Sequence, residues 1–220
     1  MKADVEQSTQ NTMDSSSSLA DEALQRSFLY SFLASVFRQE ITAQDLQQIQ
    51  SPEFQAAFRD AGVELFGLNE PDLIKRLEVE YAALFLGPGG NVSPHESVYA
   101  PGNDRLWGKT TVQVKRFIED AGFEYVEDFT AMPDHLSVEL DFMAQLTAQE
   151  AVSRQVNDVP KVINCQDYQR AFLENHLGTW VGTWSERVMA KAEMSFYSEL
   201  ARLAANFIAQ EKQNIAGDIN

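Results

Sequence analysis

The spacing of apolar side chains is the feature that most constrains the fold. Apolar residues recur at every third or fourth position from Leu24 to Phe37, which is the spacing of one face of an α-helix. The same spacing returns along the chain at Leu73–Phe85, Leu136–Leu146, Tyr168–Val188 and Phe196–Phe207. Runs of valine and isoleucine with a period of two are absent, as are Asn-Gly or Asp-Gly turns between apolar strands. The sequence therefore predicts an all-α fold of about nine helices.

The ends of the chain differ in composition from its middle. Residues 1–18 are polar, rich in serine and without periodicity, so we expect a disordered tail there. An all-helical domain is predicted over residues 19–210, followed by a flexible tail at 211–220. Pro160 interrupts the helical pattern. The domain is thus predicted to be either one bundle-like body or two lobes joined near Pro160.

Charge and cysteine content exclude several classes of function. The chain has 33 acidic and 17 basic residues, a formal net charge of -16, which repels nucleic acid and anionic membrane surfaces. The carboxylates serve either solubility or the attraction of a basic partner. The single Cys165 excludes an intrachain disulfide framework and a cysteine-based metal cage. No stretch approaches the ~20 apolar residues of a membrane span, so we expect a cytoplasmic protein without stable membrane insertion.

Two segments concentrate residues that can carry chemistry. The loop "LFLGPGGNVSPHESVYAPG", residues 84–102, is either a functional loop or a surface connector. In "AMPDHLSVELDF", Asp134 is predicted to be the N-cap of a helix with His135 in its first turn. His135 and Glu139 are four residues apart, so together with His95 they raise the alternative of a metal-dependent hydrolase.

Other candidate residues and motifs were weighed in the same way. Trp107, just after the loop, either lines a peptide groove or belongs to the core. His176 is expected to pack at a helix end. The loop lacks the Gly-Lys-Ser/Thr ending of a phosphate loop, and no Ser-His-Asp order is recognisable.

Three runs together resemble one known family. They are "EYAALFLGPGGNVSPHESVY", "MPDHLSVELDFMAQL" and "FLENHLGTWVGTWSERVMAKAEMSFYSELARLAANF". In this order, with helical intervals between them, they resemble the TorD/DmsD family of redox-enzyme maturation chaperones, relatives of the nitrate reductase delta chaperones. The resemblance extends from about Leu19 to Ile208.

The resemblance implies a non-enzymatic, all-helical chaperone of the cytoplasm without a cofactor of its own. Such a protein binds the twin-arginine signal peptide and the apo form of a molybdoenzyme catalytic subunit, assists insertion of the molybdenum cofactor and delays export. The leader-binding residues it implies, with Trp107 added from the groove argument, are Tyr81, Pro94, His95, Glu96, Ser97, Trp107, Pro133, Asp134 and His135.

Several properties stay open at this point. His95 stands where the family often has an aromatic residue or a second proline, so the client enzyme is open. A guanine-nucleotide response is open too, because no residue identifies a nucleotide site. A hinge at Pro160 would permit a domain-swapped homodimer besides a monomer.

Overall fold

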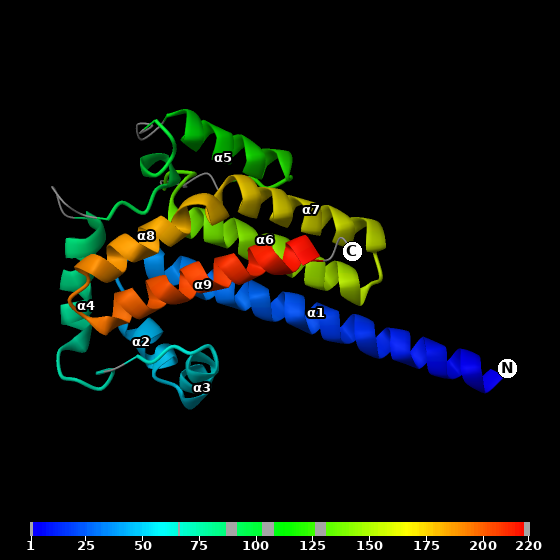
Figure 1. Cartoon of the computed structure of the whole chain (residues 1–220). Coiled ribbons are helices and arrows are strands. Elements are labelled where there is room, and N and C mark those ends of the chain that lie inside the picture. Colours follow the sequence, from blue (N-terminus) through cyan, green and yellow to red (C-terminus); the bar gives the residue numbers. More distant parts are fainter. Residues whose placement is uncertain (1, 66, 87–91, 103–107, 126–130, 218–220) are drawn as a thin grey trace.

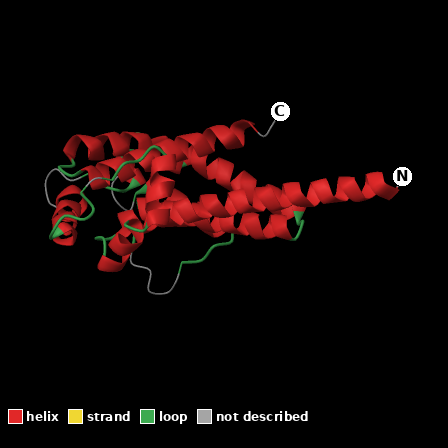
Figure 2. Ribbon diagram, turned by 90° about the horizontal axis from the view of Figure 1, so that it is seen from below, coloured by secondary structure: helices red, strands yellow, loops and turns green. Residues whose placement is uncertain are grey.

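The computed structural model describes residues 2–65, 67–86, 92–102, 108–125 and 131–217, with side chains from residue 17 to residue 215. Over these ranges it contains nine α-helices and no β-strand, which confirms the predicted all-α fold (Figure 2). Their bounds are α1 Lys2–Arg38, α2 Ala43–Ile49, α3 Pro52–Asp60, α4 Leu73–Tyr81, α5 Lys109–Asp120, α6 Leu136–Gln155, α7 Val159–Asn175, α8 Leu177–Lys191 and α9 Ser195–Gly217.

Five of these helices form the central bundle. α1 packs along α6, α7 packs on α6, and α8 and α9 lie together across them (Figure 1). The short helices α2, α3 and α4 cover one end and side of the bundle, and α5 lies over α7 on the other side (Figure 1). A π-helix, Ala82–Leu86, leads from α4 into the glycine-rich loop, which puts the loop between α4 and α5.

Local signals in the sequence explain where the short helices begin and end. Thr42 and Asp45 form a capping box at the start of α2, and Ser51 caps α3 ahead of a proline in its first turn. Gly62 and Gly122 follow α3 and α5 with φ angles of 69° and 87°, a left-handed conformation that glycine adopts without strain. Each of these signals is a local pattern of neighbouring residues in the sequence.

Both ends of the helical domain differ from the predicted limits. α1 extends upstream to Lys2, and its first part projects beyond the body of the bundle (Figures 1 and 2). A helix pairs its own backbone groups, so it can continue past the residues that pack. Among the described side chains, the buried stripe of α1 begins at Ala20, close to the predicted start at Leu19. At the other end α9 continues to Gly217, with Glu211 and Ile215 buried.

Pro160 does not join two lobes. It lies in the first turn of α7, where its missing N–H costs no helical hydrogen bond. Asp158 caps this helix by accepting a hydrogen bond from the Lys161 amide. Only a short turn separates α6 from α7, and the two helices pack against each other. Of the two predicted arrangements, the described residues have the single bundle, and Pro160 begins a helix of it instead of joining two lobes.

A network of two buried carboxylates and two half-buried arginines connects four helices near the end of α6. The Arg26 guanidinium of α1 donates to Glu211 Oε2 of α9 at 2.7 Å, to Glu150 Oε2 of α6 at 3.2 Å and to Gln169 Oε1 of α7 at 2.5 Å. Arg154 adds two hydrogen bonds to Glu150 Oε1, at 2.8 and 2.6 Å. The Glu150 carboxylate is thus the acceptor at the centre of the network.

Removing this acceptor should destabilise the whole bundle. In Glu150→Ala, the half-buried Arg26 loses one of its two carboxylates and Arg154 loses its carboxylate partner, so we expect the free energy of unfolding to fall by about 3 kcal/mol. Denaturant unfolding followed by circular dichroism measures the change. The control is Asp167→Ala, which removes the exposed partner of Arg170 and should cost less than about 1 kcal/mol. Equal effects of the two variants would contradict a central role for Glu150.

Candidate functional site

Two segments that are far apart in the sequence meet at what we call the loop–helix junction, residues 94–97 and 134–136. The Glu96 amide donates to the Asp134 carbonyl at 2.9 Å, and the Leu136 amide donates to the Pro94 carbonyl at 2.8 Å. These two bonds pair His95 with His135 as an isolated antiparallel bridge. The structure thus brings together the two segments that the sequence analysis singled out.

The buried side chain of Asp134 stabilises the junction. Its side chain is fully buried, and its Oδ2 accepts a hydrogen bond from the Ser97 amide at 3.1 Å. The prediction that Asp134 caps α6 is wrong. The cap is His135, whose Nδ1 accepts from the Ser137 amide at 3.1 Å. Asp134 is one residue too early for this role, and its carboxylate turns to the loop instead.

The two histidines lie against each other at the junction and are only partly exposed. Their ring centroids are 4.9 Å apart and the rings are nearly perpendicular. Burial, together with the neighbouring His95, lowers the pKa of His135 to about 4. Burial also lowers the pKa of His95, although Asp134 opposes the shift. Both rings are therefore neutral at pH 7, which suits the acceptor role of His135.

The remaining predicted site residues fall into three groups. Pro94, Ser97 and Pro133 are buried in or beside the junction. Tyr81 lies away from it in the aromatic core, where its hydroxyl donates to the Phe37 carbonyl at 3.1 Å and its ring packs against Phe85. Trp107 lies outside the described residues.

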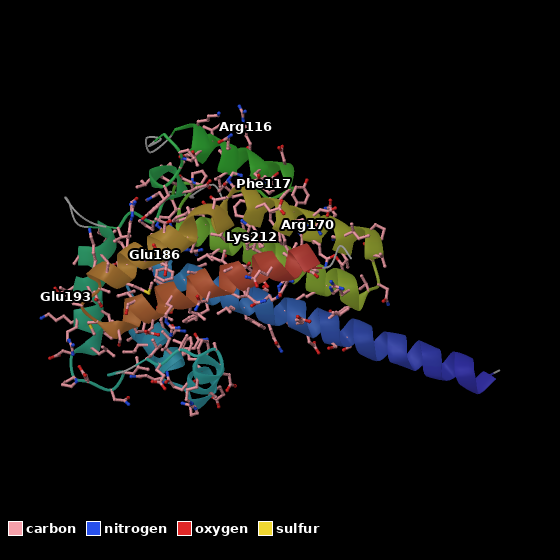
Figure 3. The ribbon with its side chains drawn as sticks, viewed as in Figure 1. Arg116, Phe117, Arg170, Glu186, Glu193 and Lys212 are labelled. Carbon is pink, nitrogen blue, oxygen red and sulfur yellow. The ribbon has the colours of Figure 1, made fainter. Side chains whose placement is uncertain are left out.

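Glu96 connects the junction to an open cleft. Its carboxylate lies 3.1 Å from His176 Nδ1, at the edge of a cleft of about 760 Å³ between α5, the loop and the start of α8. The cleft is lined by Glu96, Tyr99, Ala100, Pro101, Thr110, Gln113, Arg116, Phe117, Asp120, Asn175, His176, Thr179 and Trp180. Figure 3 shows Phe117 on the side of α5 that faces α7, and Arg116 at its outer edge.

Aromatic rings form much of the cleft wall. Tyr99 stacks on Trp180 with centroids 5.3 Å apart, and Arg187 lies 4.7 Å from the centre of the Tyr99 ring. Phe117 meets His176 edge to face at 5.5 Å. A guanidinium group already rests on one of these rings, and carboxylates lie nearby at Glu96 and Asp120. Such a wall suits a cationic side chain with apolar neighbours.

Below the cleft lies a second carboxyl group that is completely buried. Glu139 Oε2 accepts from the Trp180 indole N–H at 3.1 Å. Burial, and then the neighbouring Glu96, raise the pKa of Glu139 well above its usual range. This shift favours the protonated, neutral form of Glu139 over the carboxylate.

A tight turn between α7 and α8 places His176 in this cleft. His176 ends α7 and precedes α8, with φ −129° and ψ −104°. Gly178 allows the two helices to approach at this turn, because a Cβ atom there would lie 2.2 Å from the Leu173 carbonyl oxygen. No side chain fits at that distance without a shift of the backbone.

The hydrolase alternative is not supported by the arrangement of its three residues. It assumed that His135 and Glu139 share a helix face. His135 is instead the N-cap of α6, with extended backbone angles, and Glu139 accepts a hydrogen bond from Trp180. In the ranges that the structure describes, no three His, Cys, Asp or Glu residues are grouped so that they could hold a metal ion.

The sequence analysis missed part of the cleft. His176 was expected only to pack at a helix end, and its pairing with Glu96 links positions 80 residues apart. Thr110, Gln113, Phe117 and Asp120 could have been found as one face of α5, from their spacing of three or four residues. Tyr99 lies within the quoted loop, but nothing local indicates its stacking on Trp180.

Acidification should weaken the junction through His135. The unfolded side chain binds a proton near pH 6.5 and the folded one only near pH 4, so stability is lost as the pH falls through this window. We expect the parent to lose about 2–3 kcal/mol more than His135→Asn between pH 7 and pH 4, because asparagine caps without titrating. Urea unfolding of both proteins at several pH values measures this difference. A constant difference would show that His135 titrates normally.

Comparison with known proteins places these features in a family. The family model described as nitrate reductase delta subunit matches residues 43–186. The protein named chaperone protein TorD of Shewanella oneidensis is 28% identical, covering 89% of this chain and 92% of the relative. The chaperone protein TorD of Vibrio cholerae is also 28% identical, covering 85% of this chain and 90% of that relative. These relatives are named as chaperones, in agreement with the prediction of a non-enzymatic protein.

A solved structure shows the same fold. It is a crystal structure of a candidate redox enzyme maturation protein from Archaeoglobus fulgidus, 21% identical, covering 84% of this chain and 93% of that one with a TM-score of 0.50. Along the described helices, none combines the length and apolar character of a membrane span. The family model spans more than half of the chain and confirms the resemblance drawn from the three sequence runs. The chain belongs to the nitrate reductase delta subunit family, which includes the TorD chaperones.

Proposed function

We propose that this chain is a system-specific chaperone of the cytoplasm. It binds the twin-arginine leader and the apo form of a molybdoenzyme catalytic subunit, assists insertion of the molybdenum cofactor and delays export until the enzyme is complete. Family membership and the TorD relatives support the chaperone role. The leader as ligand is inferred from the residues of this chain together with the family resemblance.

The observation that carries the proposal is the cleft beside the loop–helix junction. It combines the Glu96 and Asp120 carboxylates with the aromatic rings of Tyr99, Phe117 and Trp180. A leader with paired arginines and an apolar stretch needs both kinds of surface, because carboxylates accept guanidinium N–H groups and rings cover apolar side chains. The net charge of -16 adds long-range attraction for such a basic peptide.

The junction has a supporting role in this proposal. Asp134, Ser97 and Pro94 are buried and line no part of the cleft, so they hold the loop in place instead of touching the peptide, whereas the largely buried Glu96 does line the cleft. Among the predicted leader-binding residues, His95 and His135 are partly exposed at the junction, and Glu96 reaches the cleft. We therefore assign contact with the leader to the cleft side of Glu96 and to the two histidine rings.

Peptide binding tests the cleft directly. Isothermal titration with a synthetic peptide carrying paired arginines and an apolar segment should show binding to the parent. Glu96→Gln keeps the shape but removes the charge, so the dissociation constant should rise about tenfold or more. Glu186→Gln, an exposed carboxylate on α8 outside the lining of the cleft (Figure 3), is the control and should change little. Equal affinities of parent and Glu96→Gln would remove the cleft from the proposal.

Capture of a client tests the function itself. Tagged protein from anaerobically grown source cells should retain a molybdoenzyme catalytic subunit that still carries its leader, as identified by mass spectrometry. The Glu96→Gln protein should capture less of it, because the leader contact is weakened. If the parent captures no such precursor, the proposed function is wrong, whereas the family membership is unaffected.

A further inference from the structure

The Glu96 carboxylate, to which we assign contact with the leader, already has a partner inside the cleft. Nδ1 of His176 lies 3.1 Å from Glu96 Oε2 and 3.3 Å from Oε1, so one ring nitrogen faces both carboxylate oxygens. Because an ionised carboxylate only accepts hydrogen bonds, Nδ1 of His176 is the nitrogen that carries the hydrogen. The other ring nitrogen, Nε2, is therefore the one that can take up a second proton.

Packing on both sides holds the His176 ring against Glu96. The two side chains are largely buried, although both line the cleft. The His176 ring lies between Phe117 of α5 and Phe172 of α7, with ring centroids 5.5 and 5.1 Å away. The pair thus belongs to the packed structure and does not depend on two long, exposed side chains meeting by chance.

The net charge of the pair depends on the protonation of His176. With a neutral ring the pair keeps the negative charge of Glu96, whereas a protonated ring cancels that charge. A guanidinium group is attracted to an ionised carboxylate, but it would be repelled by an imidazolium beside the same carboxylate. His176 therefore holds Glu96 in place in both states, and only its neutral form leaves the carboxylate charge to a cationic ligand.

The other charged or titratable groups near the pair come from three helices. They are Arg116 and Asp120 of α5, Asp134 and Glu139 at the start of α6, and Arg187 of α8, which lies over the Tyr99 ring. Burial and then Glu96 raise the pKa of Glu139 well above its usual range, so Glu139 is the group whose titration must be controlled.

The remaining two histidines of the chain are neutral near pH 7. Burial lowers the pKa of His95, and it lowers the pKa of His135 to about 4. Histidine is the side chain whose charge ordinarily changes between about pH 5 and 8. We therefore assign to His176 any change in histidine charge that affects the cleft at neutral or mildly acidic pH.

We infer that His176 is a positioning residue for the leader-binding carboxylate, and that a proton on His176 competes with the guanidinium of the leader for Glu96. This inference rests on the proposed function. When the leader binds, Nε2 of His176 releases its proton to solvent, while the guanidinium keeps its own. Binding of the leader and binding of the proton then oppose each other, so the affinity for the leader rises with pH.

Isothermal titration at several pH values tests this coupling. The probe is an acetylated and amidated peptide with paired arginines and an apolar segment, which has no group that titrates near neutral pH. The dissociation constant of the parent should fall about tenfold from pH 5.5 to pH 8. At pH 6.5, two buffers of different ionisation enthalpy should reveal release of up to about one proton for each peptide bound.

Three variants assign the effect to the pair. His176→Asn keeps an N–H donor but cannot gain charge, so its dissociation constant should stay within about twofold over this pH range. Glu139→Gln can still accept from Trp180 and does not titrate, so it should keep the pH dependence of the parent. Glu96→Gln should bind about tenfold more weakly than the parent at pH 8 but within about twofold of it at pH 5.5.

Each contrary result has its own meaning. A parent that binds the peptide equally at all pH values, without proton release, overturns the inference and leaves the proposed function in place. A pH dependence that persists in His176→Asn, or that disappears in Glu139→Gln, also overturns the inference. A parent that binds no peptide at any pH removes both the proposed function and the inference.

A measurement on the parent decides the matter if His176→Asn does not fold, as shown by circular dichroism. In NMR spectra at pH 6.5, the ring resonances of His176 should move toward their high-pH positions when the peptide is added. Resonances that keep their free-state positions at saturating peptide overturn the inference, because the ring would then not lose its proton.

Discussion

The backbone pairing at the loop–helix junction determines how the rest of the site is arranged. Two amide hydrogen bonds and the buried Asp134 carboxylate fix residues 94–97 against the start of α6. Glu96 is held in this segment, so its carboxylate reaches His176 and the cleft. A loop without these bonds would leave its buried amides unpaired, at a cost of about 1–3 kcal/mol for each group. The position of the Glu96 carboxylate therefore depends on backbone hydrogen bonds made by this segment.

Charge is distributed unevenly over this acidic chain. Inside the bundle, Arg26 pairs with both Glu150 and Glu211, and burial raises the pKa of Glu139, which favours its neutral form. The cleft keeps the Glu96 and Asp120 carboxylates beside aromatic rings. Charge is thus paired inside the bundle and lies open to solvent in the cleft.

The sequence predicted those features that depend on neighbouring residues. Apolar spacing indicated the helices, and local patterns such as Thr42 with Asp45 and Ser51 with Pro52 lie where helices begin. Contacts between segments that are distant in the sequence could not be predicted from neighbouring residues. The Asp134 carboxylate could either cap the helix that follows it or accept a hydrogen bond from a distant segment. In the structure it accepts from the Ser97 amide. Pro160 was ambiguous for the same reason, because a proline fits both a break between lobes and a first helical turn.

The close approach at Gly178 also limits how the cleft can diversify. A side chain at this position would collide with the Leu173 carbonyl and move α8 relative to α7, and with it both His176 and Trp180. The position of the cleft wall formed by α8 is thus constrained by this close approach. Gln113 and Arg116 on α5 are exposed, so they can be exchanged without disturbing the backbone. Adaptation of this cleft to a new client would therefore be concentrated on the outer turns of a single helix.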